Sequence, residues 1–556
     1  MAKVRRPLKI VLILIFFLSL TLRLIKLGEN PTFISDEASI GYNAFSILKT
    51  GKDEWGKSFP IYFKAFSEYK LPLYIYLAVP FVGLFGLNEF AVRLPSALVG
   101  AFTPILLFLL MSQLFSEKKY SSFLALLSAF FLAISPWHLQ VSRMALEANL
   151  ALFLTCLGVY LFLVAQEKKR VWYLCLSFFV LGLTFYTYNA NRVFIPLFLL
   201  FLFVKDRKKR KFLRKNWPAL LIFFFFILSI VLTGFRGSQE RLSKVSIFSD
   251  RGLTARIFEK RVSCQENLPF LVCRGIFSQT VFYPFVFAKN YLSHFNPNFL
   301  FKGPGLAHYG VPGVGMIYWL ELPFLLTGFW YLLRKKSPKI FLLSWLIAAP
   351  VANSVTGTAH PVRSLLLLPC FSLLVSLGIF YWFNWLKNYT AALRASIILL
   401  EYYKKLFLGV IIFCFFISLG FFLKKYWLEY PLQTGSVWQS GYKPLYQFLS
   451  SKEQEYDRIW VTKFYGEPHI FYLFYSQFDP TKYQNEQGVA RYVRKDGWAN
   501  VDKIGKYFFF QDKKMIEENK KREIIVFFPS EIDAQEGDEY IRYRNGEVAF
   551  VIKSQP

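Results

Sequence analysis

Long apolar stretches recur along the first three quarters of the chain and predict helices that cross a membrane. A helix needs about 20 apolar residues to span a bilayer. An eleventh stretch, Val193–Val204, is short, but the basic residues that follow it favour counting it as a span. The ten stretches that reach or nearly reach spanning length cover residues 8–27, 94–115, 120–137, 146–165, 171–188, 216–234, 316–333, 340–356, 365–386 and 406–423.

Lysine and arginine residues gather in the segments that connect these stretches. Six such segments hold 25 Lys/Arg against four Asp/Glu, and with eleven spans they fall at every second connection. Because cytoplasmic loops are rich in Lys and Arg, we predict a cytoplasmic N-terminus and an extracytoplasmic C-terminal region. Without the Val193–Val204 span, the most basic segment would lie outside. The six segments are Met1–Ile10, Ser116–Tyr120, Gln166–Val171, Lys205–Lys215, Arg334–Lys339 and Asn384–Lys405.

A further apolar stretch, Leu71–Leu87, is an alternative twelfth span. Counting it would turn the later basic loops outward, and Pro72, Pro80 and Gly83 interrupt it. We therefore expect a helix at the outer membrane interface, within a first outer loop of residues 28–93. Charged residues follow the first apolar run, so an uncleaved first span is a better interpretation than a signal peptide.

From about residue 425 the pattern changes to short apolar strands and polar helices. Strands are predicted at Arg458–Thr462, Tyr507–Phe510, Glu523–Phe528 and Val548–Ile552, with a helix at Glu467–Gln477. The sequence thus predicts a mainly α, polytopic membrane protein with a transmembrane domain at 1–424 and a soluble extracytoplasmic α/β domain at 425–556. The soluble domain holds 19 Lys/Arg and 19 Asp/Glu.

Composition alone raises a different possibility. The chain is 54% hydrophobic, which excludes disorder, collagen and disulfide scaffolds, but its net charge of +30 is typical of nucleic-acid binding. The six cytoplasmic segments account for +21 of that charge and the soluble domain for none, which leaves +9 on the outer loops and spans. The basic charge is thus mainly a topology signal, and no nucleic-acid partner is expected.

Cysteines give little information about function. Four of the six lie in predicted spans. Cys264 and Cys273 share the long outer loop at 235–315, and the sequence favours neither a disulfide between them nor two free thiols. The chain has no metal-type cysteine cluster, no P-loop and no dinucleotide glycine fingerprint.

The candidate chemistry lies near the outer ends of the spans. Asp36 and Glu37 open a predicted helix in the first outer loop. Ser35 or Asp36 would cap that helix and Glu37 would complement its dipole. Alternatively, a carboxylate at the membrane surface would serve as the general base for an acceptor group.

Basic side chains near the outer face suit a phosphate. Each arginine there can be an interfacial residue by itself, but several of them together with Lys70 match phosphate oxygens and a phosphate leaving group. Glu147, one helical turn after Arg143, would either pair with that arginine or support an acceptor. The donor-binding candidates are Lys70, Arg93, Arg143, Arg192 and Arg363, and the acceptor or supporting candidates are His138, Glu147, Tyr188 and His360.

These motifs together resemble the GT-C membrane glycosyltransferases of the protein O-mannosyltransferase and aminoarabinose transferase type. The resemblance is clearest over residues 1 to about 200 and continues more weakly to His360-Pro-Val-Arg363. The motifs are Asp36-Glu37, Lys70-Leu-Pro-Leu-Tyr, Ala91-Val-Arg-Leu-Pro-Ser96 and Ser135-Pro-Trp-His followed by Arg143.

The resemblance implies an inverting transfer of a hexose or pentose from a polyprenyl-phosphate donor to an acceptor at the outer face of the cytoplasmic membrane. Asp36 matches the position of the family's catalytic acidic residue, and Glu37 matches the position next to it. Arg93 and Arg143 match positions that lie near the lipid phosphate in the family. Many relatives have Asp where Glu147 stands here. The acceptor is a protein, a lipid or a cell-envelope polysaccharide. No cofactor is expected, and a divalent metal is possible but not favoured, because cationic side chains can neutralise a single phosphate.

Two other functions fit the same span pattern. A transporter or flippase of a lipid-linked glycan also needs many spans and basic residues, but it more often shows an internal repeat and polar residues at mid-depth. A non-catalytic sugar-sensing or scaffold protein would keep the fold without the chemistry.

Overall fold

The computed structural model describes residues 6–555 apart from 67, 116–119, 206, 234–245, 304, 306–308, 335–338, 393–396, 496, 517–521 and 534. Parts of the predicted loops Met1–Ile10, Ser116–Tyr120, Lys205–Lys215, Arg334–Lys339, Asn384–Lys405 and 235–315 therefore lie outside the described residues. The chain divides into two compact units. Unit 1 comprises Met1–Leu22, Val99–Val141 and Ala148–Phe422, and unit 2 comprises Arg23–Leu98, Ser142–Glu147 and Leu423–Pro556.

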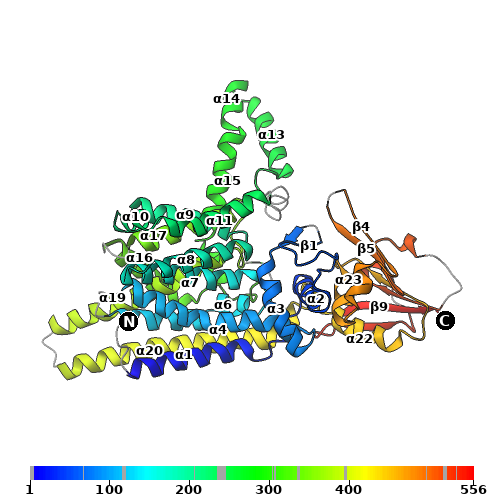
Figure 1. Cartoon of the computed structure of the whole chain (residues 1–556), viewed down its shortest axis with the longest axis horizontal. Helices are drawn as coiled ribbons and strands as arrows, with labels where there is room; N and C mark the ends of the chain where they lie inside the picture. The colour runs from blue at the N-terminus through cyan, green and yellow to red at the C-terminus, as the bar shows by residue number, and fades with distance from the viewer. Residues whose placement is uncertain are drawn as a thin grey trace. The chain divides into compact units, whose positions relative to one another are not determined.

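Unit 1 is helical, and each of the eleven predicted spans coincides with a helix (Figure 1). Its longer helices are α1 (Arg6–Leu24, shared with unit 2), α4 (Glu89–Leu114, also shared), α5 (Ser121–Ile134), α6 (Pro136–Ser142), α7 (Glu147–Lys168), α8 (Val171–Leu183), α9 (Asn191–Lys205), α10 (Arg207–Lys215), α11 (Pro218–Leu232), α13 (Arg251–Gln265), α14 (Phe270–Ile276), α15 (Gln279–Ser293), α16 (Leu322–Arg334), α17 (Lys339–Ala348), α19 (Leu368–Ala392) and α20 (Ile397–Lys424). Short helical turns are α18 (Val351–Ser354), η1 (Thr184–Tyr186), η2 (Asn298–Lys302), η3 (Trp319–Glu321) and η4 (Leu365–Leu367).

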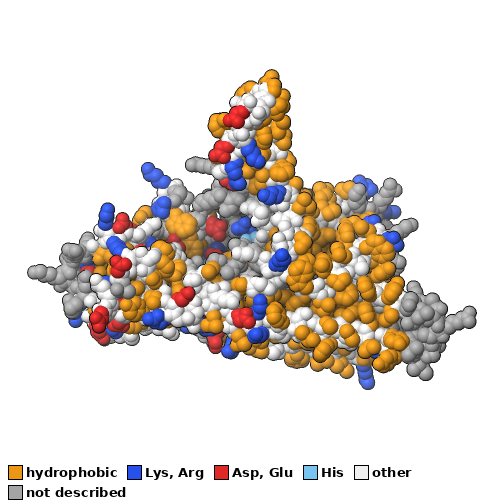
Figure 2. Space-filling model, turned by 180° about the vertical axis from the view of Figure 1, so that it is seen from behind, with side chains coloured by type: hydrophobic (Ala, Val, Ile, Leu, Met, Phe, Trp, Pro, Cys, Tyr) orange, Lys and Arg blue, Asp and Glu red, His pale blue; other side chains and the backbone are white. Residues whose placement is uncertain are grey.

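The lengths of these helices make the protein a multi-pass membrane protein. Among the described residues, six helical segments are long and apolar enough to cross a bilayer, and the pair α5 and α6, bent by 58°, makes a seventh. One of the six, Phe270–Lys302, lies in the predicted outer loop and is not among the eleven predicted spans. Several of the predicted spans, such as α8 and α9, are shorter, so the count of eleven and the orientation stay predictions. Figure 2 shows a broad hydrophobic surface over the helical unit, as expected for side chains that face lipid.

Two glycines allow α16 and α19 to cross closely. A Cβ atom added at Gly328 would lie 1.8 Å from the carbonyl oxygen of Leu374, and one at Gly378 would lie 2.0 Å from that of Phe324. Because the clashing atoms belong to the backbone, a larger residue at either position must separate the helices. Small residues at such crossings are a common basis of helix association in membranes.

Unit 2 joins the first outer loop to the C-terminal region. Its elements are α2 (Ser35–Thr50), β1 (Phe63–Ala65), β2 (Glu68–Lys70), α3 (Pro72–Phe85), the first turns of α4, η5 (Lys425–Glu429), α21 (Tyr430–Gln433), α22 (Tyr442–Lys452), β3 (Arg458–Thr462), α23 (Pro468–Tyr475), α24 (Pro480–Gln484), β4 (Val489–Val493), β5 (Ala499–Ile504), β6 (Tyr507–Phe510), η6 (Lys513–Met515), β7 (Glu523–Phe527), η7 (Pro529–Glu531), β8 (Glu539–Arg542) and β9 (Val548–Gln555). The four strands and the helix predicted in the C-terminal region are all present.

The C-terminal strands form one seven-stranded sheet in the order β4-β5-β6-β3-β7-β9-β8. The central strand β3 runs parallel to β6 and β7, whereas the outer pairs are antiparallel. All five residues of β7 are buried, as expected for a central strand that is covered on both faces.

Helix α2 is held between the start of α4 and the C-terminal helix α23. Glycine at position 41 makes the fit possible, since a Cβ atom there would lie 2.6 Å from the ring of Phe474 and 2.7 Å from a methyl group of Val92. The C-terminal domain therefore packs directly on the helix that begins with Asp36 and Glu37.

Candidate functional site

The first turn of α2 carries a carboxylate that is still accessible. Asp36 is 43% exposed, and the ammonium group of Lys70 donates to its Oδ1 atom at 2.5 Å. Lys70 ends β2 and is itself 7% exposed, with its ammonium group 5.9 Å from the ring centre of Phe66. The sheet of β1 and β2 thus brings a nearly buried cation to the helix N-terminus.

Electrostatics keep Lys70 protonated. Burial by itself lowers the pKa of a lysine, but the negative charge of Asp36, followed by that of Glu147, outweighs it and raises the pKa of Lys70 above its ordinary value. A nearly buried lysine that stays charged near neutral pH is a suitable partner for an anion such as a phosphate.

The neighbouring carboxylate, Glu37, has a different environment. Its side chain and that of Arg93 are both 0% exposed and form a two-pronged ion pair, with N–O distances of 2.7 and 2.6 Å. The same carboxylate accepts the backbone N–H groups of Ala145 at 2.8 Å and Ile34 at 3.3 Å. Both oxygens of Glu37 therefore already bind protein groups.

This geometry corrects the predicted capping of α2. Neither Ser35 nor Asp36 is the N-cap, because the helix begins at Ser35 and Ile34 precedes it. The Glu37 side chain reaches back to the Ile34 N–H instead, since a residue in the first helical turn can accept the free backbone donors there.

Arg93 uses all its donors within the protein. Besides its two bonds to Glu37, its guanidinium donates to the carbonyl oxygens of Leu27, Pro31 and Thr32 at 3.1, 2.6 and 3.0 Å. These five contacts match the five N–H donors of an arginine. Arg93 therefore ties the loop that enters α2 to the start of α4.

Arg143 holds the same loop from another side. It is 1% exposed and donates to the carbonyl oxygens of Arg23, Lys26 and Asn30 at 3.0, 3.3 and 2.8 Å. Its Nε donates to the hydroxyl of Tyr426 at 3.1 Å. The loop at 23–30 is thus fixed by a cation that binds its carbonyl groups.

The remaining candidates lie in unit 1. His138 is buried in α6, Tyr188 and Arg192 flank the start of α9, and Arg192 donates to the carbonyl oxygen of Phe185 at 2.9 Å. His360 accepts the backbone N–H of Val362 at 3.2 Å. Arg363 donates to the Thr356 hydroxyl at 3.4 Å. The structure thus brings together Asp36, Glu37, Lys70, Arg93 and Arg143 in unit 2, with Glu147 close enough to influence Lys70, and places the other five in unit 1.

Sequence reasoning missed a polar network around the His360 segment. The side-chain amide of Asn353 lies 2.9 Å from Nε2 of His294 and donates to the hydroxyl of Ser364 at 3.3 Å. That hydroxyl also accepts the backbone N–H of His360 at 3.3 Å. An asparagine in an apolar stretch was the available signal, but nothing local indicated its partners.

Sequence reasoning also missed the polar contacts that fasten the C-terminal domain to the first outer loop. Arg491 lies between the rings of Trp55 and Tyr483, 4.3 and 4.6 Å from their centres, and donates to the carbonyl oxygen of Glu54 at 2.8 Å. The amide of Gln484 donates to three oxygens on and just after α2. Burial raises the pKa of Glu54 to about 7, against the opposing effect of a hydrogen bond from the Asn43 side chain.

A metal site is not evident in the part of the chain that the structure describes. No three His, Cys, Asp or Glu side chains there form a group that could hold a metal ion. The metal independence expected from the sequence stays a prediction.

Comparison with known proteins supports the resemblance. Residues 70–233 match the family described as dolichyl-phosphate-mannose-protein mannosyltransferase. The chain is also 27% identical over 206 residues to YkcB of Bacillus subtilis (strain 168), a candidate mannosyltransferase. That alignment covers 36% of this chain and only 27% of the relative. The similarity to this type of glycosyltransferase is confirmed over the first part of the chain.

Solved structures show the same fold over nearly the whole chain. ArnT from Cupriavidus metallidurans, bound to undecaprenyl phosphate, matches with a TM-score of 0.53 at 12% identity, over 98% of this chain and 97% of its own. The archaeal oligosaccharyltransferase AglB from Archaeoglobus fulgidus, in complex with an inhibitory peptide and a dolichol-phosphate, matches with a TM-score of 0.51 at 14% identity, over 93% and 75%. An apo oligosaccharyltransferase structure from the same organism matches over 84% of this chain and 64% of its own. At these identities the likeness concerns the fold.

Proposed function

We propose that this protein is an inverting glycosyltransferase that moves a sugar from a polyprenyl-phosphate donor to an acceptor at the outer face of the cytoplasmic membrane. The match of residues 70–233 to the mannosyltransferase family supports sugar transfer, and the lipid phosphates named for ArnT and AglB support the donor class. The observation that carries the proposal is the accessible Asp36 carboxylate beside the nearly buried Lys70 ammonium.

In this proposal Asp36 is the general base. It accepts the proton of the acceptor group while that group attacks the anomeric carbon of the donor sugar. The bond between the anomeric carbon and the phosphate oxygen breaks, and the polyprenyl phosphate leaves with the electron pair. A general base at such a position contributes typically about 10²- to 10⁴-fold to the rate.

Lys70 binds the donor phosphate and neutralises the charge that develops on it. Because its ammonium lies 2.5 Å from Asp36, a phosphate bound to Lys70 is held next to the base. A positioned cation stabilises a leaving phosphate most strongly where water is excluded. Glu147, also in unit 2, is a candidate for acceptor contacts. The donor and acceptor roles expected for Arg192, Arg363, His138, Tyr188 and His360 of unit 1 stay predictions.

Glu37, Arg93 and Arg143 have positioning roles in this account. Glu37 and Arg93 neutralise each other in a buried pair, and Arg143 binds backbone carbonyl groups. These contacts fix the loop and the first turn of α2, so that Asp36 keeps one orientation without itself being buried. A preorganised carboxylate needs little rearrangement during the reaction.

The test is sugar transfer by an Asp36→Asn variant reconstituted in liposomes with labelled polyprenyl-phosphate mannose and a membrane acceptor fraction. We expect a loss of at least about 100-fold in transfer rate, with unchanged membrane insertion. The matched control is Asp457→Asn, because Asp457 is 50% exposed and lies in the C-terminal domain. Parent-like transfer by Asp36→Asn would remove Asp36 from the mechanism.

A further inference from the structure

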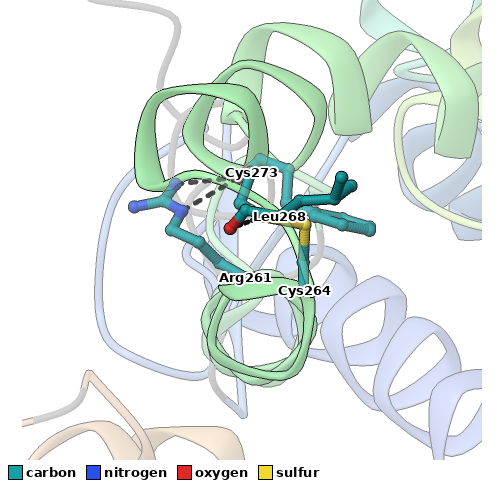
Figure 3. Close-up of a disulfide and its surroundings, with 5 residues drawn as sticks. Arg261, Cys264, Leu268 and Cys273 are labelled. Atoms are coloured by element: carbon teal, nitrogen blue, oxygen red, sulfur yellow. Dashed lines mark hydrogen bonds between the residues drawn. A yellow bond between two sulfur atoms is a disulfide. The ribbon is translucent and has the colours of Figure 1, made fainter. Parts of the chain in front are cut away.

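Helices α13, α14 and α15 form a hairpin with its own small core. Buried Leu253 and Ile257 of α13 pack with Ile247 against aromatic side chains of α15, such as Phe282. A disulfide joins Cys264 and Cys273 near the tip, and Arg261 donates to the carbonyl oxygen of Phe277 at 2.8 Å (Figure 3). The hairpin is therefore a defined element with a stapled tip.

The outward faces of this hairpin are also apolar. Phe258, Leu271, Phe285 and Leu292 are 63, 77, 65 and 66% exposed. A helical hairpin in water buries one apolar face and presents polar residues on the other, and large exposed apolar patches mark binding surfaces. Figure 2 shows the same hydrophobic covering on the hairpin. Further large apolar residues exposed on the hairpin are Val262, Leu268, Phe270, Val272, Ile276 and Val281.

Basic residues accompany this apolar surface. Residues 250–293 hold six Lys/Arg and three Asp/Glu. Arg256, Lys260, Arg274 and Lys289 are exposed. Apolar side chains mixed with cations are typical of helices that lie in the interface of a membrane containing anionic lipid.

The hairpin is oriented for such a position. Within unit 1 it stands off the bundle and runs across the direction of long helices such as α20 (Figure 1). It connects the end of α11 to the segment before α16, and the charge pattern of the loops assigns these helix ends to the outer face. An element that runs across the spanning helices at their outer ends lies along the membrane surface.

A membrane crossing fits the hairpin less well. The region Phe270–Lys302 is long and apolar enough by composition to be a span. One added span would turn the later basic segment Arg334–Lys339 outward. A crossing by both arms would bury α13, in which five of 15 residues are charged. The charges thus favour the interface over either crossing.

We propose that the α13–α15 hairpin is an interfacial element that inserts its apolar surface into the outer leaflet and binds anionic lipid headgroups through its lysines and arginines. The unchanged protein tests this in liposomes that contain a phospholipid with a photoreactive group near the headgroup end of its acyl chain. We expect crosslinked peptides from 258–292, with a yield that rises with the fraction of anionic phosphatidylglycerol. Crosslinks on α1 and α20 without any on the hairpin would overturn the proposal.

Spin labels distinguish the membrane from other partners of the hairpin. Single labels are placed by Phe258→Cys or Phe285→Cys after the free cysteines 156, 175, 370 and 414 are replaced by alanine. The control is Phe464→Cys, because Phe464 is 54% exposed in the C-terminal domain. In liposomes we expect hairpin labels to be more accessible to oxygen than to a water-soluble nickel chelate, and the control label to show the reverse. Chelate access equal to that of the control, or exclusion of both reagents as at a protein interface, would contradict the proposal.

Discussion

Removal of the Glu37 carboxylate should destabilise unit 2 strongly. The Glu37→Gln substitution keeps the shape of the side chain but leaves the guanidinium of Arg93 buried without its counter-charge, since both side chains are 0% exposed in the parent. Removal of one partner of a buried ion pair costs about 3–5 kcal/mol. Other partners of Arg93 are neutral carbonyl groups, such as that of Pro31, which cannot replace the charge. We expect a loss of that size in the free energy of unfolding.

The assay is unfolding of the purified protein in detergent, followed for Glu37→Gln, Arg93→Gln and the double variant. Because the two side chains interact directly, the double variant should be less destabilised than the sum of the single variants. Asp457→Asn is the matched control, since its ion pair with Arg522 is exposed on both sides and such a pair contributes about 0–1 kcal/mol. Parent-like stability of Glu37→Gln, or additive losses in the double variant, would refute the assignment of Glu37 to a structural ion pair.

Three further changes test other parts of the structure. Lys70→Gln should lower kcat/KM for the donor by at least about 10-fold in a transfer assay, because the bound phosphate loses its cation. Lys70→Arg keeps the positive charge and should recover part of the activity. Equal rates for the parent, Lys70→Gln and Lys70→Arg would remove Lys70 from donor binding. Gly328→Leu should prevent stable assembly of the helix bundle, because the new side chain meets the backbone of α19. The measurement is the yield of monodisperse protein in detergent. The control is Gly409→Leu, which should be tolerated because an added Cβ there meets nothing within 4 Å, and equal yields of the two variants would contradict the close crossing. Burial raises the pKa of Glu54 from 4.5 to about 7, so the fold favours the protonated form of this carboxyl group. The free energy of unfolding should therefore fall by on the order of 3 kcal/mol as pH rises from 4.5 to about 7. Glu54→Gln should flatten this part of the pH profile of unfolding, and an unchanged slope would contradict the raised pKa.

The sequence predicted the helices and strands better than the contacts among them. Apolar periodicity indicates an element such as β3 or α4 locally, because the spacing of apolar residues follows the geometry of each element. The short helix α9, of 15 residues, was recognisable as a span only from the charges around it. Motif similarity singled out Asp36 and Lys70, and the structure places them in contact.

The different environments of Asp36 and Glu37 could not be predicted from their adjacent positions. Successive residues of a helix point in different directions, and the partners of Glu37 come from residues 56 and 108 positions away. Likewise, Asn30 donates to the carbonyl oxygen of Tyr426, 396 positions away, and no local pattern indicates that contact. Long-range polar contacts of this kind depend on the assembled fold.

The most direct test of the proposed function is a count of products from the parent protein in liposomes given doubly labelled polyprenyl-phosphate mannose and a membrane acceptor fraction. We expect one free polyprenyl phosphate for each sugar that appears on the acceptor, and neither product with Asp36→Asn. Movement of the intact lipid-linked sugar across the bilayer, without cleavage of the bond between sugar and phosphate, would contradict a transferase and indicate a transporter.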